Sequence, residues 1–201
     1  MTSTPYFTHL QKDKKLEKVL SEQQPIVLKE EKDHVAYLCS SIIGQQLSTK
    51  VAAVIRDRFF SLIDAEKKLA EQIIGLDIDA MRLVGLSQSK AAYMKNLASF
   101  SIEHENQISS LNNMSDQEIV KFLTQIKGIG AWTVEMLLMF AMQREDVFPV
   151  DDLGIQQAMI KLYEIEASSK KELKLKMNLI ADSWSPYRTY ASMHLWRWKD
   201  S

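Results

Sequence analysis

Apolar residues recur along the chain with the three-to-four-residue spacing of α-helices, and the alternation typical of strands is scarce. We therefore predict an all-α protein built from many short helices. Capping patterns support several boundaries, such as Ser115 followed by Glu118 at the start of one helix. The expected helices cover residues 10–21, 31–44, 48–63, 67–74, 77–84, 88–102, 115–126, 131–142, 153–163, 170–182 and 186–198.

The length of 201 residues suits one compact unit or two small lobes. The polar stretch at 103–115 is the natural place for a boundary between lobes. We expect residues 1–114 to form mainly a first helical lobe, although its N-terminal helices are free to pack on the second. Residues 115–201 are expected to form that second lobe. The lysine-rich segment at 166–176 is expected to be a solvated face.

Composition narrows the classes of function. Hydrophobic residues make up 46% of the chain, charged residues 25%, and the net charge is −1, which is ordinary for a globular protein. Nucleic-acid binding would therefore depend on a few placed groups rather than on a bulk positive field. The single cysteine, Cys39, excludes an internal disulfide and a four-cysteine metal cluster, and is expected to be buried. The first fifteen residues lack the apolar core of a signal peptide, and the apolar stretch at 136–142 is too short to span a membrane.

The most informative segment is the turn at 123–133, where one helix leads into Gly128-Ile129-Gly130 and another helix follows at once. Glycines let the chain reverse tightly, and the start of the second helix presents backbone N–H groups to an anion. Ile126 and Ile129 are expected to pack the two helices together. Gly-x-Gly alone fits an ordinary helix–helix turn, but the full spacing Leu-x-x-Ile-x-Gly-Ile-Gly favours an anchor for a DNA backbone.

Two acidic residues, Asp151 and Asp152, follow an apolar run and directly precede a predicted helix. Spacing alone favours a structural interpretation, in which one carboxylate caps the helix and the other complements its dipole.

The hairpin, followed about twenty residues later by this aspartate pair, resembles the helix-hairpin-helix DNA glycosylase superfamily. The resemblance implies a two-lobed fold with the active site in the cleft between lobes. It assigns the catalytic carboxylate to Asp152, and leaves Asp151 as the helix cap or an orienting neighbour. It also implies DNA contacts from Lys127, Gly128, Ile129, Gly130 and Thr133, and a monovalent cation, Na⁺ or K⁺, held by the carbonyls of Thr124, Ile126 and Ile129.

Trp132 stands where superfamily members that also nick the strand carry a lysine nucleophile. The resemblance therefore implies simple hydrolysis by water. Trp132 fits either the core or a lesion pocket, and we favour the pocket, because an indole can stack on a cationic purine. Met136 is assigned to the same pocket.

The aromatic C-terminal segment, from Trp184 to Trp198, resembles the end of the 3-methyladenine DNA glycosylase II family. That match implies that Trp196 lines the base pocket. His194 is expected to be a hydrogen-bonded structural residue, and Arg188 a structural or phosphate contact.

The segment Ile-Gly-Gln45-Gln46-Leu47-Ser resembles a bend of the same family that enters the duplex and fills the gap left by a flipped base. Gln45, Gln46 and Leu47 are therefore expected to contact DNA, with Gln46 at the wedge position. A polar helix–helix turn is nearly as good an interpretation from these residues alone. Residues 83–91 also resemble the family, where they join two helices of one lobe.

The sequence thus predicts a monofunctional DNA-3-methyladenine glycosylase II type hydrolase. Its expected substrate is an alkylated purine in double-stranded DNA, and its expected product is an abasic site. It is expected to be a monomer without an organic or redox cofactor or a membrane partner, cytoplasmic if bacterial and nuclear if eukaryotic. The alternatives are a non-catalytic helix-hairpin-helix DNA-binding module and a glycosylase for another lesion.

Overall fold

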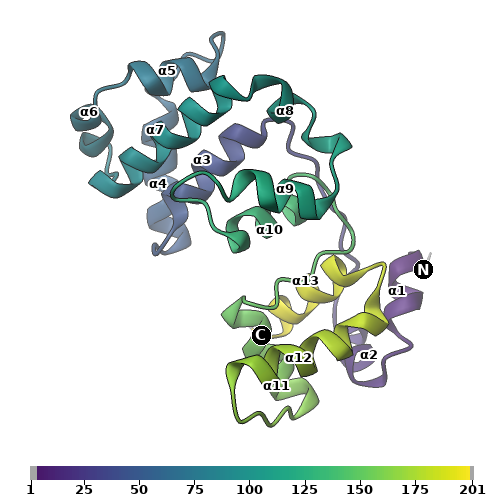
Figure 1. Cartoon of the computed structure of the whole chain (residues 1–201). Coiled ribbons are helices and arrows are strands. Elements are labelled where there is room, and N and C mark those ends of the chain that lie inside the picture. Colours follow the sequence, from purple (N-terminus) through teal and green to yellow (C-terminus); the bar gives the residue numbers. More distant parts are fainter. Residues whose placement is uncertain (1–3, 200–201) are drawn as a thin grey trace. The chain divides into compact units, whose positions relative to one another are not determined.

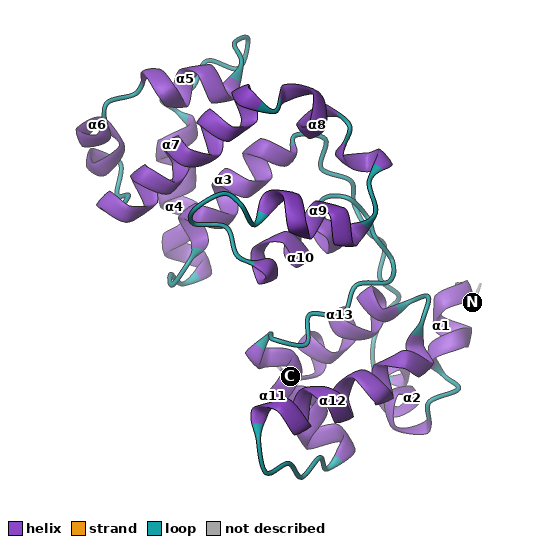
Figure 2. Cartoon of the chain, in the orientation of Figure 1, coloured by secondary structure: helices purple, strands orange, loops and turns teal. Residues whose placement is uncertain are grey.

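A computed structural model describes residues 4–199, and within them every regular element is a helix (Figures 1 and 2). None of the helices in this range is long and apolar enough to cross a membrane. The α-helices are α1 Pro5–Leu10, α2 Lys14–Ser21, α3 His34–Gly44, α4 Thr49–Phe60, α5 Leu69–Gly75, α6 Ile78–Leu83, α7 Gln88–Glu103, α8 Glu105–Ser109, α9 Asp116–Leu123, α10 Ala131–Phe140, α11 Leu153–Tyr163, α12 Lys170–Ala181 and α13 Arg188–Lys199, with 3₁₀ turns η1 Leu111–Asn113 and η2 Asp182–Trp184.

The all-α prediction is confirmed, and each expected helix has a counterpart. The clearest difference lies near the N-terminus, where the expected helix at 10–21 is interrupted and a separate helix, α1, precedes it. Pro5 opens α1, and the Asp13 carboxylate accepts hydrogen bonds from the backbone N–H groups of Lys15 and Leu16, which caps a new helix. The last helix starts at Arg188, two residues later than expected.

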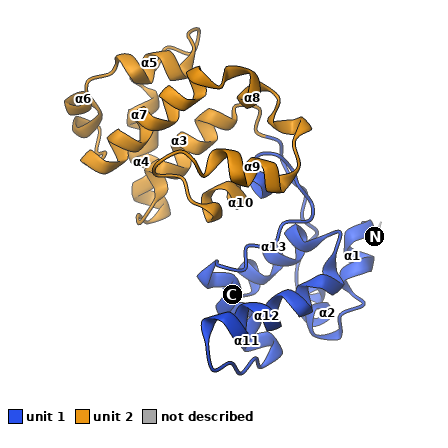
Figure 3. Cartoon of the chain, viewed as in Figure 1, with its two compact units in different colours: residues 1–30, 138–201 blue, residues 31–137 orange. Residues whose placement is uncertain are grey.

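The chain forms two compact units, residues 1–30 with 138–201, and residues 31–137 (Figure 3). This division differs from the expected boundary near residue 115. The polar stretch at 103–115 is no linker, because it contains α8 and η1, and Leu111 within it is buried. The hairpin at 123–133 therefore belongs to the unit of residues 31–137, and α10 runs across the division.

The unit of residues 31–137 is organised around α7, which packs against α3, α5 and α6. Ser87 caps α7 by accepting from the backbone N–H of Lys90, and Ser115 and Glu118 form the predicted capping box of α9. The apolar face of α7, including Met94 and Leu97, is fully buried. Each such side chain adds about 1.5–3 kcal/mol of hydrophobic stabilisation, so this helix is a firm support for the segments attached to it.

In the unit of residues 1–30 and 138–201, α13 packs against α11 and α2. Asp13, the N-cap of α2, connects that helix to α11 and η2, because its Oδ2 accepts hydrogen bonds from Tyr163 Oη at 2.6 Å and Trp184 Nε1 at 3.0 Å. Burial alone would raise the pKa of Asp13, but the bonds from Tyr163, Trp184 and the backbone outweigh it and hold the pKa below its ordinary value. The shared core includes these buried apolar side chains: Leu16, Leu20, Ile155, Met159 and Leu195.

Candidate active site

Asp152 lies at the N-terminus of α11, where hydrogen bonds from α11 and α13 hold its carboxylate. Its Oδ1 accepts from the backbone N–H of Ile155 at 2.9 Å and from the indole Nε1 of Trp196 at 2.8 Å. The positive end of the helix dipole stabilises a negative charge at this position. The direction of the carboxylate is therefore fixed by two elements, α11 and α13.

Trp196 meets Asp152 closely because Gly154 leaves room between them. A Cβ on Gly154 would lie 3.0 Å from both Asp152 Oδ1 and Trp196 Cδ1. The half-buried indole also stacks on Phe140, with ring centroids 5.9 Å apart and planes 26° apart. The sequence pointed to Trp196 as a pocket residue but did not reveal its hydrogen bond to the carboxylate.

Asp151, the neighbouring acid, has a different environment. Its exposed carboxylate forms an ion pair with Lys174 of α12. The expectation that Asp151 caps α11 is wrong, because Asp152 does so. Asp152 is therefore both the helix cap and the candidate catalytic residue, so its structural and catalytic interpretations are compatible.

The hairpin has the predicted structure, with α9 and α10 joined by a tight turn. Ile126 and Ile129 are buried and pack the turn into the unit of residues 31–137, as expected. Gly128 has a φ of +108°, and a Cβ there would lie 2.3 Å from Cγ of Tyr93, so only glycine fits. Gly130 is exposed, and apart from its chain neighbours no atom of residues 4–199 lies within 4 Å of the position of its Cβ. This glycine therefore leaves open space on the outer side of the hairpin.

The other residues expected near this hairpin divide into exposed and buried side chains. Lys127 is exposed, and Trp132 is 45% exposed, unusual for so large an apolar side chain. Thr133 and Met136 are instead buried, at 4% and 8% exposure. A DNA contact from Thr133 would therefore use its backbone, and Met136 belongs to the core in this structure rather than to an open pocket wall.

The bend after α3 is a tight turn closed by a hydrogen bond from Leu47 N to Gly44 O at 3.1 Å. Gln45 has φ −51° and ψ 127°, and Gln46 has φ +58°, the pattern of a type II turn. The Gln45 side chain is occupied within the protein, because its Nε2 donates to Gly128 O at 3.1 Å. Gln46 and Leu47 are exposed at the tip, so they are the members of this predicted DNA contact that face outward.

Three residues of α7, which sequence analysis did not assign to the site, support the bend after α3 and the hairpin. Lys90 bonds to the bend after α3, while Tyr93 packs under Gly128 and Asn96 Nδ2 donates to Lys127 O at 3.2 Å. Their spacing of three along one helix was the available signal, since it places them on one side of α7.

The carbonyls suggested for a monovalent cation come from the end of α9 and the turn. Ile126 O accepts the backbone N–H of Ile129 at 3.0 Å and retains a second lone pair, and Thr124 is the exposed C-cap of α9. Carbonyl oxygens are suitable ligands for such an ion. No cluster of three His, Cys, Asp or Glu side chains suited to a metal ion occurs in residues 4–199.

Two polar residues of the aromatic C-terminal segment have structural roles. His194 is fully buried and its Nδ1 lies 2.8 Å from Gln23 Oε1. Burial, with a smaller contribution from the Arg197 charge, lowers the pKa of His194 to about 4. Arg188 donates to both carboxylate oxygens of Asp146, at 2.8 and 2.9 Å, which favours the structural alternative for this arginine.

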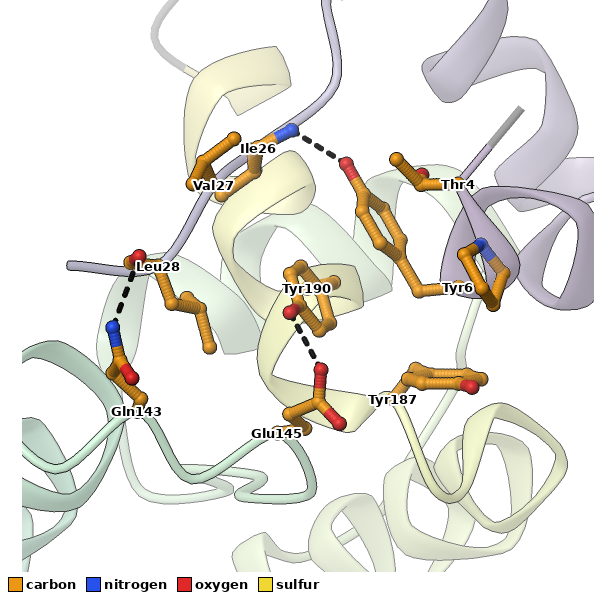
Figure 4. Close-up of a pocket in the computed structure, with 10 residues that line it drawn as sticks. Thr4, Tyr6, Ile26, Val27, Leu28, Gln143, Glu145, Tyr187 and Tyr190 are labelled. Carbon is orange, nitrogen blue, oxygen red and sulfur yellow. Dashed lines mark hydrogen bonds between the residues drawn. The ribbon is translucent and has the colours of Figure 1, made fainter. Parts of the chain in front are cut away.

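A pocket of about 600 Å³ lies elsewhere in the unit that contains Asp152 (Figure 4). Tyr6, Tyr187 and Tyr190 line it, and Tyr190 Oη donates to Glu145 at 2.7 Å. Neither Asp152 nor any other predicted site residue lines this pocket. The active-site assignment therefore rests on the chemistry around Asp152 rather than on this pocket.

Residues 39–182 match the family described as HhH-GPD superfamily base excision DNA repair protein. The chain therefore belongs to this superfamily, named for its helix-hairpin-helix. It is 35% identical over 192 residues to DNA-3-methyladenine glycosylase 1 of Schizosaccharomyces pombe, covering 92% of this chain and 80% of the relative. A Bacillus subtilis protein provisionally named DNA-3-methyladenine glycosylase YfjP is 34% identical over 181 residues, which are 86% of this chain and 61% of the longer relative.

Solved structures give the same result. A DNA-3-methyladenine glycosidase from Bacillus halodurans superposes with a TM-score of 0.85 at 29% identity, covering 100% of this chain and 91% of the other. The S. pombe 3-methyladenine DNA glycosylase in complex with abasic DNA superposes with a TM-score of 0.80 at 32% identity, covering 96% of each chain. By sequence and by fold, the chain is thus a member of the helix-hairpin-helix DNA glycosylase superfamily.

Proposed function

We propose that this protein is a monofunctional glycosylase that hydrolyses the N-glycosidic bond of alkylated purines, such as 3-methyladenine and 7-methylguanine, in double-stranded DNA. The product is an abasic site, and the process is base excision repair. The observation that carries the proposal is the Asp152 carboxylate, fixed at a helix N-terminus by Ile155 and Trp196.

The chemistry requires a fixed negative charge. Departure of the base leaves positive charge on the sugar in an oxocarbenium-like transition state. A carboxylate that is already oriented stabilises this charge without reorganising during the reaction. Asp152 is suited to this role because two donors hold Oδ1. The same carboxylate can orient the attacking water.

The substrate class follows from the leaving group and the exposed indole. A purine alkylated at N3 or N7 carries a positive charge, so it leaves readily and needs little help from an acid. Trp132 is exposed and can stack on such a cationic ring. Trp132 also stands where a lyase would carry its lysine, so water is the nucleophile and the strand stays intact.

Binding to DNA is assigned to the hairpin and to the tip of the bend after α3. The open space at Gly130 lets a phosphate approach the first N–H groups of α10. A monovalent cation on the carbonyls of Thr124, Ile126 and Ile129 would neutralise part of the phosphate charge. Gln46, exposed at the tip of the bend, is proposed to fill the gap left by the flipped base.

The test is to incubate the purified protein with DNA methylated by dimethyl sulfate and to identify the released bases by chromatography. We expect 3-methyladenine and 7-methylguanine from the wild type, and release slower by orders of magnitude from Asp152→Asn. Binding without release of any base would support a non-catalytic DNA-binding module instead. Faster release of neutral 8-oxoguanine from a matched duplex would support a glycosylase for another lesion.

A further inference from the structure

Lys90 of α7 binds the bend that carries Gln46. Its Nζ donates to Ile43 O at 2.8 Å and to Gln45 O at 2.7 Å. The first carbonyl lies in the last turn of α3, and the second belongs to the peptide between Gln45 and Gln46. One ammonium group therefore joins the end of the helix to the centre of the turn.

The bond from Lys90 Nζ to Gln45 O favours the type II form of the turn. Type I and type II turns differ mainly by a flip of their central peptide, and only type II needs a positive φ at the third residue. Here that residue is Gln46, with φ +58°, although a side chain makes this conformation unfavourable and glycine would be preferred. The carbonyl that would move in the flip is Gln45 O, which Lys90 holds.

The same side of α7 also holds the hairpin. Tyr93 packs under Gly128, and Asn96 Nδ2 donates to Lys127 O. The bend is joined to the hairpin directly as well, because Gln45 Nε2 donates to Gly128 O. The segment proposed to meet the phosphate and the segment proposed to enter the duplex are thus fixed to one rigid helix.

We propose that Lys90 is a positioning residue that holds the bend at residues 44–47 in its type II form, so that Gln46 points outward at a fixed place relative to the hairpin and can fill the gap in the duplex. The part about the duplex rests on the proposed function. The part about the turn does not.

Lys95 supplies a matched control on the same helix. Its Nζ donates to Ile74 O and Leu76 O at the end of α5, so it has the same kind of bond as Lys90. The variants Lys90→Met and Lys95→Met each remove one ammonium group from two carbonyls. Only Lys90→Met releases the bend.

The first experiment measures the turn by denaturant unfolding of five variants: Gln46→Gly, Lys90→Met, Lys95→Met, and each lysine change combined with Gln46→Gly. Glycine removes the cost of positive φ. The increase in the folding constant caused by Gln46→Gly should therefore be about fivefold larger in the wild-type background than in the Lys90→Met background. The benefit should persist beside Lys95→Met. An equal benefit in both lysine backgrounds would overturn the proposal. If Lys90→Met does not fold, Lys90→Gln replaces it.

The second experiment measures gap filling without catalysis. Wild type and both lysine variants are titrated with an undamaged duplex and with one containing a tetrahydrofuran abasic analogue beside 2-aminopurine. Lys90→Met should bind undamaged DNA within about twofold of wild type, because phosphate contacts carry this affinity. Its affinity for the abasic duplex should fall about tenfold, as expected when a hydrogen bond to a charged group is lost. The change in 2-aminopurine fluorescence on binding should be lost as well. Lys95→Met should behave as wild type.

Two outcomes overturn the role in gap filling: full retention of the abasic preference by folded Lys90→Met, or no such preference in the wild type. Neither depends on base release. A wild type that prefers the abasic duplex through Lys90 but releases no methylated base would contradict the proposed catalytic function alone.

Discussion

The indole Nε1 of Trp196 donates a hydrogen bond of 2.8 Å to Oδ1 of Asp152, linking two residues that are 44 positions apart. The second donor to the same oxygen is the backbone N–H of Ile155. Two helices therefore determine the direction of one carboxylate. A side chain that resembled a pocket wall in the sequence also orients the group proposed to carry the chemistry.

Replacing Trp196 by phenylalanine should slow base release by about tenfold or more, because a hydrogen bond to a charged group is lost. The ring is retained, so stacking on Phe140 and the core should change little. Single-turnover release of 7-methylguanine measures the effect. The control is Trp198→Phe on the same helix, α13, where the ammonium of Lys161 from α11 lies over the Trp198 ring. Equal rates for Trp196→Phe and wild type would show that the indole N–H does not support Asp152.

The two hairpin glycines should respond differently to substitution. Gly128→Ala combines a positive φ with a collision against Tyr93, so it should destabilise the fold by about 2 kcal/mol or more. Gly130→Val meets no protein atom, so it should remain folded but bind every DNA sequence less tightly. Thermal melting and fluorescence anisotropy on two unrelated duplexes test both statements. Full DNA affinity in folded Gly130→Val would remove the hairpin from the binding surface.

His194 predicts how stability depends on pH. Its pKa is lowered from 6.5 to about 4, because burial, and to a lesser degree the charge of Arg197, disfavours the protonated ring. The unfolded chain binds this proton more readily, so the stabilisation is complete above pH 6.5 and is lost as the pH falls toward 4. The loss amounts to about 3 kcal/mol.

The measurement is the free energy of unfolding in urea at several pH values across that window, for wild type and His194→Gln. The variant should be less stable at neutral pH and should show a flatter dependence on pH. Identical slopes for the two proteins would contradict a buried neutral His194.

Strand cleavage should be absent. Trp132 offers no amine to form a Schiff base with the sugar, so borohydride should trap no covalent complex on a duplex containing 7-methylguanine. A helix-hairpin-helix enzyme with the lyase lysine serves as the positive control. Efficient trapping by this protein would refute hydrolysis by water alone.

Local sequence predicted most helices because their signals are local. Ser87, Ser115 and Asp33 each accept a hydrogen bond from a backbone N–H within the next four residues, so they cap α7, α9 and α3. The hairpin was equally accessible, since its turn itself requires a glycine at Gly128. Residue types and spacing were sufficient for these features.

Features that depend on distant contacts were not predicted. The break between α1 and α2 lies near Asp13, whose carboxylate is held by Tyr163 and Trp184 from far along the chain. The packing of residues 1–30 with the C-terminal unit agrees with the alternative left open for the N-terminal helices, but the boundary was placed near residue 115, whereas α9 and most of α10 belong to the unit of residues 31–137. The different environments of Asp151 and Asp152 depend on Lys174 and Trp196, which no local pattern identifies.

The central claim is that the charge of Asp152, and not only its role as helix cap, drives base release. Asn caps a helix about as well as Asp, and its carbonyl oxygen can still accept from Ile155 and Trp196, so Asp152→Asn should keep the fold. The loss in stability should be limited to a dipole contribution of about 0.3–1 kcal/mol. Asp151→Asn removes only an exposed ion pair and is the matched control.

The decisive measurement is single-turnover release of 7-methylguanine by wild type, Asp152→Asn and Asp151→Asn, with melting curves for all three. We predict that Asp152→Asn is folded and binds DNA but releases the base slower by orders of magnitude, while Asp151→Asn stays close to wild type. A folded Asp152→Asn with wild-type activity would contradict the carboxylate mechanism and leave Asp152 as a helix cap alone.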